Sequence, residues 1–260
     1  MIFGISTSCF YPLHTEDAAR HLAEAGIPAA EVFFNAPSEL NPDYLRELKK
    51  ILNDGGTQIV SVHPFTCGLE PLLFFSEYQR RFWDGIQWYR SYFAAASILG
   101  AKYFILHGDR KEAETSDSLY FERFAGLNAA AAEYGIQVAQ ENVARCKSGS
   151  LTFLKKMKDF LPDTVFALDL KQARRAGEDW QEIYSVLGSN VRHIHLSGCS
   201  DTEDCLPVTR GNFDCLHFLR TLQNGGFDGA ILLELYRGNY GDYSELYDCW
   251  KKMENYAAIS

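Results

Sequence analysis

Six short apolar runs in this sequence each end in a side chain that can bind a metal ion or transfer a proton. A single histidine or carboxylate at the end of such a run is more often a cap or a salt-bridge partner than a ligand. Six of them converging on one place would be costly to bury unless they were paired or coordinated. We therefore interpret the set as a functional site: His63, His107, Glu141, Asp169, His195 and Glu234.

Four of these side chains follow one another on successive runs. Glu141, Asp169, His195 and Glu234 supply three carboxylates and one imidazole, a set that suits Mn²⁺, Mg²⁺ or Co²⁺ and also accepts Zn²⁺. Neighbouring strands of a sheet lie about 4.8 Å apart, so that one ion is within reach of all four strand ends. The sequence therefore predicts one divalent metal ion as a cofactor.

Two further polar residues lie on the same runs. His193 stands two residues before His195 and points the same way in a strand, so we interpret it as a deeper residue or a hydrogen-bonding neighbour of the site. Glu31 begins the second apolar run, and a structural role and a place in the site remain equally open for it. The other histidines are expected at the surface: His14, His21 and His217.

The elements that must position these residues alternate regularly along the chain. Eight short runs rich in Ile, Val, Leu and Phe are apolar on both faces, which is typical of parallel strands covered by helices. The predicted strands are Ile2–Thr7, Ala30–Phe34, Gln58–His63, Lys102–His107, Gln137–Glu141, Thr164–Asp169, Val191–His195 and Ala230–Leu235.

Helix signals occupy the segments between the predicted strands. Asn41-Pro42 is a favourable start, and Gly55-Gly56 is a favourable stop, for one helix. Thr15 is expected to cap an earlier helix that ends before Gly26. A long aromatic helix is predicted from about Ser76 to Gly100. Further helices are predicted over Ser118–Tyr134, Ser150–Phe160, Asp179–Leu187, Asp214–Asn224 and Ser244–Asn255.

Eight strand–helix units in 260 residues match a single (β/α)₈ TIM barrel, an α/β fold, spanning residues 1–260. A doubly wound open sheet is the alternative, but it usually has fewer strands and a glycine-rich first turn. The first turn here reads Thr7-Ser8-Cys9-Phe10-Tyr11-Pro12, and the chain contains neither a G-x-G-x-x-G motif nor a P-loop.

The amino-acid composition argues against several classes of protein. The 25 Lys and Arg against 34 Asp and Glu give a formal charge of −9, which argues against a nucleic-acid partner. The seven cysteines are odd in number and form no C-x-x-C pair, so we expect reduced thiols. No apolar stretch reaches the roughly 18–20 residues of a membrane span. The first residues, Met1–Ser6, lack a basic region, so we do not expect them to be a signal peptide. We expect a cytoplasmic protein.

In order along the chain, these motifs resemble the xylose isomerase-like TIM barrel superfamily. That group includes sugar isomerases and epimerases, inosose dehydratases, hydroxypyruvate isomerases and apurinic endonucleases (family 2). The segments that carry the resemblance are Ala25–Val32, Val62-His63, Leu106-His107, Gln140-Glu141-Asn142, Leu168-Asp169-Leu170, His193-Ile194-His195 and Leu233-Glu234-Leu235.

The resemblance to the ketose epimerase branch implies a metal-dependent sugar isomerase or epimerase. One divalent ion would be held by Glu141, Asp169, His195 and Glu234. Glu141 and Glu234 would be the catalytic base and acid in proton transfer next to a carbonyl, through a metal-bound enediolate. The resemblance also implies a small sugar or polyol substrate bound by His63, His107 and Gln172, and a homo-oligomer.

Three alternatives stay open. An inosose-type dehydratase would use the same ligands, and a non-catalytic sugar-binding barrel would keep the fold alone. A zinc-dependent apurinic endonuclease would need histidines where this chain has Gln172 and Glu203-Asp204-Cys205. The loop Cys205–Gly211 also departs from the H-x-P-x-G-x-G pattern of the family, so that the resemblance does not identify one sugar.

Overall fold

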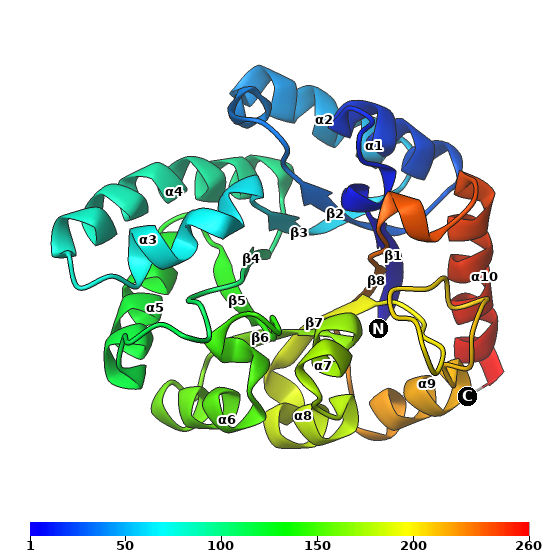
Figure 1. Cartoon of the computed structure of the whole chain (residues 1–260). Coiled ribbons are helices and arrows are strands. Elements are labelled where there is room, and N and C mark those ends of the chain that lie inside the picture. The colour runs from blue at the N-terminus through cyan, green and yellow to red at the C-terminus, as the bar shows by residue number, and fades with distance from the viewer. Residues whose placement is uncertain (260) are drawn as a thin grey trace.

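The apolar runs form parallel strands that pair in chain order. The computed structural model describes residues 1–259, and within this range eight strands close into a barrel in which β8 pairs with β1 (Figure 1). The strands are β1 (Ile2–Ser6), β2 (Ala29–Phe33), β3 (Gln58–His63), β4 (Tyr103–Leu106), β5 (Gln137–Glu141), β6 (Val165–Asp169), β7 (Val191–Leu196) and β8 (Ala230–Leu233).

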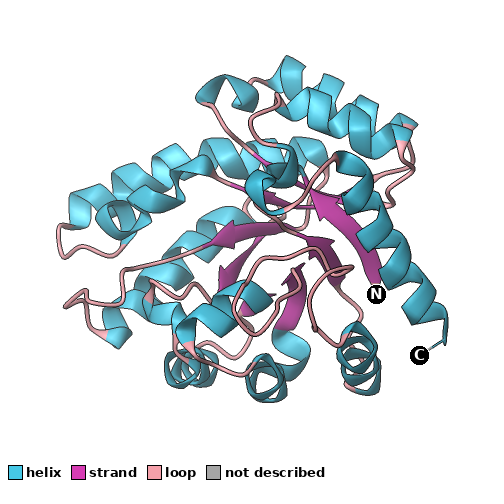
Figure 2. Ribbon diagram, turned by 45° about the vertical axis from the view of Figure 1, so that its right-hand side comes forward, coloured by secondary structure: helices cyan, strands magenta, loops and turns pink. Residues whose placement is uncertain are grey.

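Helices connect the strands and surround the barrel on its outside (Figure 2). They are α1 (Thr15–Glu24), α2 (Pro42–Asp54), α3 (Glu70–Phe74), α4 (Gln79–Leu99), α5 (Asp117–Ala132), α6 (Leu151–Phe160), α7 (Leu170–Ala176), α8 (Trp180–Leu187), α9 (Cys215–Asn224) and α10 (Tyr243–Ile259). The predicted (β/α)₈ TIM barrel is confirmed.

Most of the hydrophobic core lies between the strands and the helices. Outward-facing residues such as Val62, Phe104 and Leu168 pack there against apolar helix faces, including Leu45 and Leu48 of α2. This double coverage explains why the strands have no polar face, since each outward position meets a helix and each inward position meets the barrel interior.

The barrel interior is filled with small and apolar residues before the strands reach the site. Ala139 and Ala167 are neighbours there in an apolar cluster of β4, β5 and β6. Since side chains on one face of a strand recur every second residue, the next inward positions on β5 and β6 are Glu141 and Asp169. The period of the strands therefore carries these carboxylates to the C-terminal rim of the barrel.

A close approach of two strands requires glycine at the start of the barrel. A Cβ atom added to Gly4 on β1 would lie 2.0 Å from the carbonyl oxygen of Ala29 on β2. The absence of a side chain thus allows β1 and β2 to pair at this point.

The structure corrects several expected boundaries. Thr15 does not cap α1, because the N-cap is His14 and the Thr15 hydroxyl donates to Glu39 instead. The long aromatic helix begins at Gln79 rather than near Ser76, and the short helix α3 precedes it. Helix α7 was not expected, because it starts directly at the end of β6.

Two expectations from composition can be compared with the structure. Within residues 1–259, no helix is both long enough and apolar enough to cross a membrane. All seven cysteines are free thiols, as the sequence predicted.

Candidate active site

Four strand ends meet at one point of the barrel rim. Glu141, Asp169, His195 and Glu234 each offer one ligand atom, and these atoms all lie within 4.8 Å of one another. Nδ1 of His195 lies 3.1 Å from Glu141 Oε1, 3.6 Å from Glu234 Oε2 and 3.9 Å from Asp169 Oδ2. We call this group the quartet.

Local hydrogen bonds fix Asp169 in the quartet. It ends β6 and also caps α7, where its Oδ1 accepts from the backbone N–H of Gln172 at 2.8 Å. Asn142 holds its backbone by donating to the Asp169 carbonyl at 3.0 Å and accepting from its N–H at 2.6 Å. The cap occupies one carboxylate oxygen, so that Oδ2 is left for the quartet.

The quartet fits a divalent cation. Glu141 Oε2 and Asp169 Oδ2 are buried and have no hydrogen-bond partner. His107 Nε2 and Lys171 Nζ lie 2.9 and 3.1 Å from them, close enough for an ion pair but without hydrogen-bond alignment. Buried carboxylate oxygens with free lone pairs are costly unless something coordinates them, and three such carboxylates with an imidazole suit Mn²⁺, Mg²⁺, Co²⁺ or Zn²⁺.

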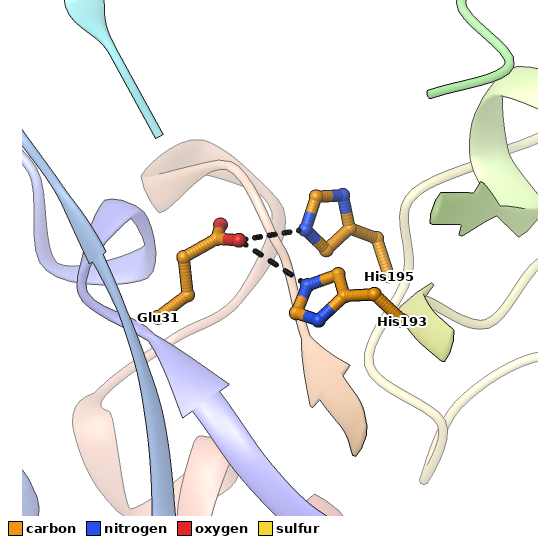
Figure 3. A group of neighbouring side chains, drawn as sticks. All are labelled: Glu31, His193 and His195. Carbon is orange, nitrogen blue, oxygen red and sulfur yellow. Dashed lines mark hydrogen bonds and ion pairs between the residues drawn. The ribbon is translucent and has the colours of Figure 1, made fainter. Parts of the chain in front are cut away.

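Glu31 faces the imidazole of His195, and also that of His193 (Figure 3). Its Oε2 is 3.2 Å from Nε2 of His195 and 3.2 Å from Nε2 of His193. The hydroxyls of Ser6 and Ser61 donate to the same carboxylate at 3.2 and 2.8 Å. The open question about Glu31 is thereby answered, since it is a buried neighbour of the site.

The position of Glu31 determines which nitrogen of His195 can serve as a ligand. A carboxylate accepts and never donates when ionised, so Nε2 of His195 carries a proton toward Glu31. Burial by itself would raise the pKa of Glu31, but His195 and His193 hold it well below the ordinary value. Nδ1 of His195 faces the quartet, 3.1 Å from Glu141 Oε1, and is therefore the nitrogen that a bound cation would use, as in the carboxylate–histidine–metal arrangement of many metal sites.

Two further histidines extend the site from Glu141. Nε2 of His107 lies 2.9 Å from Glu141 Oε2 and 2.9 Å from Nε2 of His63. Nδ1 of His63 faces the Pro64 carbonyl at 3.1 Å, so that this nitrogen is the donor and Nε2 accepts. Burial and the neighbouring His107 lower the pKa of His63 to about 4, so that it is a neutral acceptor.

The two glutamates of the quartet are ionised at neutral pH. Burial would raise the pKa of Glu141, but His107 and His195 hold it well below the ordinary value. Burial opposes ionisation of Glu234 as well, yet Lys171 and His195 lower its pKa to about 2. Both carboxylates are therefore in the form that can accept a proton or ligate a cation.

The sequence patterns missed Lys171. Its ammonium lies 2.8 Å from Glu234 Oε2 and 3.1 Å from Asp169 Oδ2, and the residue is only 4 % exposed. It stands in the first turn of α7, an unpredicted helix, so that no strand-end rule pointed to it. A lysine two residues after a candidate ligand was the available signal.

Gln172, which we expected near the substrate, lies at the edge of the site. Its side-chain oxygen accepts from the backbone N–H of Ala144 at 3.1 Å. This bond connects α7 to the segment after β5 and uses the side-chain oxygen of Gln172.

A cavity of about 360 Å³ opens beside the quartet at Glu234. This volume lies within the usual range for small-molecule sites, which begins at roughly 300 Å³. Aromatic rings and a few polar groups form its wall: Tyr11, Phe33, Tyr236, Ser8 and Asn35. The composition of the wall suits a molecule with both apolar C–H faces and hydroxyl groups.

Glu70 is a second buried group that the sequence patterns missed. It begins α3, and its Oε2 accepts from the backbone N–H groups of His107 and Gly108 at 2.9 and 2.7 Å. Its Oε1 is buried without a partner, and burial raises its pKa to about 8. Glu70 thus anchors the end of β4, from which His107 projects.

Glu70 should make the protein less stable as pH rises. The native state keeps the Glu70 proton up to about pH 8, whereas the unfolded chain releases it near pH 4.3. Because the native state binds more protons in this window, the free energy of unfolding should fall by about 1.4 kcal/mol per pH unit for this group. Urea denaturation of Glu70→Gln between pH 5 and 8 should show a shallower decline than wild type, while the exposed Glu24→Gln should not. Equal slopes for Glu70→Gln and wild type would contradict this assignment.

Comparisons with known proteins agree with the architecture. The family described as a xylose isomerase-like TIM barrel matches residues 19–253. An uncharacterized protein of Methanocaldococcus jannaschii is 23 % identical over 250 residues, covering 90 % of this chain and 83 % of the relative.

Two solved structures illustrate the similarity of fold. A D-tagatose 3-epimerase-like protein superimposes with a TM-score of 0.83 at 18 % identity, covering 100 % of this chain and 98 % of the other. The IOLI protein with a bound zinc atom has a TM-score of 0.78 at 16 % identity, covering 100 % and 99 %.

Proposed function

Because the chain belongs to the xylose isomerase-like TIM barrel family, we propose that it is a divalent-metal-dependent isomerase or epimerase of sugars. The observation that carries this proposal is the quartet, whose ligand atoms lie within 4.8 Å of one another at the barrel rim. The similarity in fold to a D-tagatose 3-epimerase-like protein and to a zinc-bound protein supports both the substrate class and the metal.

The first role of the quartet in this proposal is to hold the metal ion. Glu141, Asp169, His195 and Glu234 would hold the ion, with Glu31 keeping His195 in the ligating tautomer. A bound divalent ion supplies Lewis-acid polarisation of a substrate carbonyl, which makes the hydrogen on the neighbouring carbon more acidic.

The chain's own carboxylates would then move the proton. Glu141 and Glu234 come from β5 and from the residue that follows β8, so they approach the centre from different parts of the rim. Removal by one carboxylate and delivery by the other inverts the carbon, as an epimerase requires. Removal and return by a single carboxylate transfers hydrogen between adjacent carbons, as an aldose–ketose isomerase requires. Positioned proton transfer of this kind contributes about 10²–10⁴-fold to rate.

The remaining polar groups would orient the substrate. His63 and His107 form a connected pair next to Glu141, and the amide nitrogen of Gln172 would donate to a hydroxyl. The cavity beside Glu234, lined by Tyr11, Phe33 and Tyr236 among others, would take the carbon chain of a sugar.

A deuterium-exchange assay tests the proposal. Incubation with a panel of ketoses and inososes in D₂O with Mn²⁺ should incorporate deuterium at the carbon next to the carbonyl and yield an epimer or isomer, detected by NMR. Loss of water from an inosose would instead identify a dehydratase. Absence of exchange with every substrate, in protein that has bound Mn²⁺, would favour a non-catalytic sugar-binding barrel.

A further inference from the structure

Lys171 presents a positive charge to the carboxylates proposed to hold the metal. Its Nζ is 2.8 Å from Glu234 Oε2 and 3.1 Å from Asp169 Oδ2. These two atoms are also the oxygens that face His195 Nδ1 within the quartet. The ammonium and a divalent ion would therefore bind the same two carboxylate oxygens.

We infer that Lys171 is a resident cation of the quartet that weakens divalent-metal binding and compensates the buried carboxylates when no ion is bound. This inference rests on the proposed metal site, but it concerns a residue that the proposed reaction does not use. It predicts a site with moderate metal affinity that remains folded after the metal is removed.

Electrostatic repulsion from Lys171 should weaken the binding of a divalent ion. A cation bound by Asp169 and Glu234 would stand within a few ångströms of the Lys171 ammonium, inside a buried site where charges are screened far less than in water. Two like charges at such separation repel, and each ion pair with Lys171 also has to be shared or broken when the metal binds. Removing the ammonium should therefore strengthen metal binding.

Lys171 should also stabilise the buried carboxylates when no ion is bound. Glu141 and Asp169 are almost fully buried, and Glu234 is largely so. Breaking a buried ion pair by removing one of its partners is strongly destabilising. Lys171 supplies such a partner from a fixed position, since the residue is 4 % exposed.

The surroundings of Lys171 would also accommodate the ammonium if an ion displaces it. Nζ lies 5.0 Å from the centre of the Tyr236 ring, within the range of a cation–π contact. The Tyr236 hydroxyl accepts from Arg175 at 3.0 Å, so that the ring is held in place. Lys171 also lines a separate cavity of about 470 Å³ that includes Asp204.

Calorimetric titration with Mn²⁺ at fixed ionic strength tests the inference on the full chain. Lys171→Gln should bind Mn²⁺ more tightly than wild type, by about 10- to 100-fold if the repulsion matches in size the losses seen when groups that support metal ligands are removed. The matched control is Lys156→Gln, which removes one exposed charge paired with Asp117 and should leave the affinity unchanged. Lys171→Arg keeps the charge and should not bind more tightly than wild type.

Thermal unfolding supplies a second readout that needs neither substrate nor turnover. In EDTA, Lys171→Gln should have a Tm about 5 °C or more below that of wild type, and Mn²⁺ should raise the Tm of this variant more than that of wild type. If the variant can be purified only with Mn²⁺ bound, this dependence on the metal also supports the stabilising role of Lys171.

The outcomes separate this inference from the proposed function. If wild type binds Mn²⁺ and Lys171→Gln binds it equally or more weakly, the role of Lys171 is wrong and the metal site stands. Tighter binding by Lys171→Arg would also contradict it. If neither wild type nor Lys171→Gln binds any divalent ion, both the metal site and the role of Lys171 are wrong.

Discussion

Replacing Glu141 or Glu234 with glutamine should lower kcat by about 10²–10⁴-fold, the contribution of a positioned proton-transfer group. Glutamine keeps the size of the side chain and one carbonyl oxygen, but it cannot take up or deliver the proton. The measurement is kcat for each variant on a sugar that shows deuterium exchange with wild type. The exposed Glu133→Gln, which removes a surface pair with Arg90, should retain full activity.

The two glutamine variants should remain folded, which circular dichroism and Tm would verify. Unchanged kcat in both variants would show that neither carboxylate transfers the proton. A loss confined to one variant would favour proton removal and return by a single carboxylate, and thus an isomerase rather than an epimerase.

Asparagine at position 169 should remove the bound metal from the protein. Asp169→Asn removes the negative charge of this carboxylate from the quartet. The amide oxygen of the asparagine can still accept a hydrogen bond from the backbone N–H of Gln172 at the start of α7. Wild type purified from medium containing Mn²⁺ should hold one divalent ion per chain by elemental analysis, and the variant should hold much less than one. Activity of wild type should disappear in EDTA and return with Mn²⁺.

The choice of asparagine separates metal loss from unfolding. Asp169→Ala would remove the helix cap together with the ligand, and caps contribute about 1 kcal/mol. Asp163→Asn, at an exposed position, serves as the control for a lost carboxylate. A full complement of metal in folded Asp169→Asn would rule Asp169 out as a ligand.

The sequence alone determined the barrel and the members of the quartet. Strand length, apolar character and helix punctuation are local properties, and eight repeats of them admit few folds. The strand period of two then carries the inward positions of β5 and β6 from Ala139 and Ala167 to Glu141 and Asp169. The convergence of these residues with His195 and Glu234 follows from closure of the barrel.

The surroundings of the quartet, in contrast, depend on the packing of the whole barrel. The contact of Glu31 with His195 spans 164 residues, and that of Lys171 with Glu234 spans 63. Both depend on strand register and on side-chain directions that no local pattern encodes. Lys171 and Glu70 reach the site from the first turns of helices, where a charged residue ordinarily faces solvent. Whether a charge at such a position is exposed or buried is settled by the packing of the whole barrel, because burial is a property of the neighbours in space.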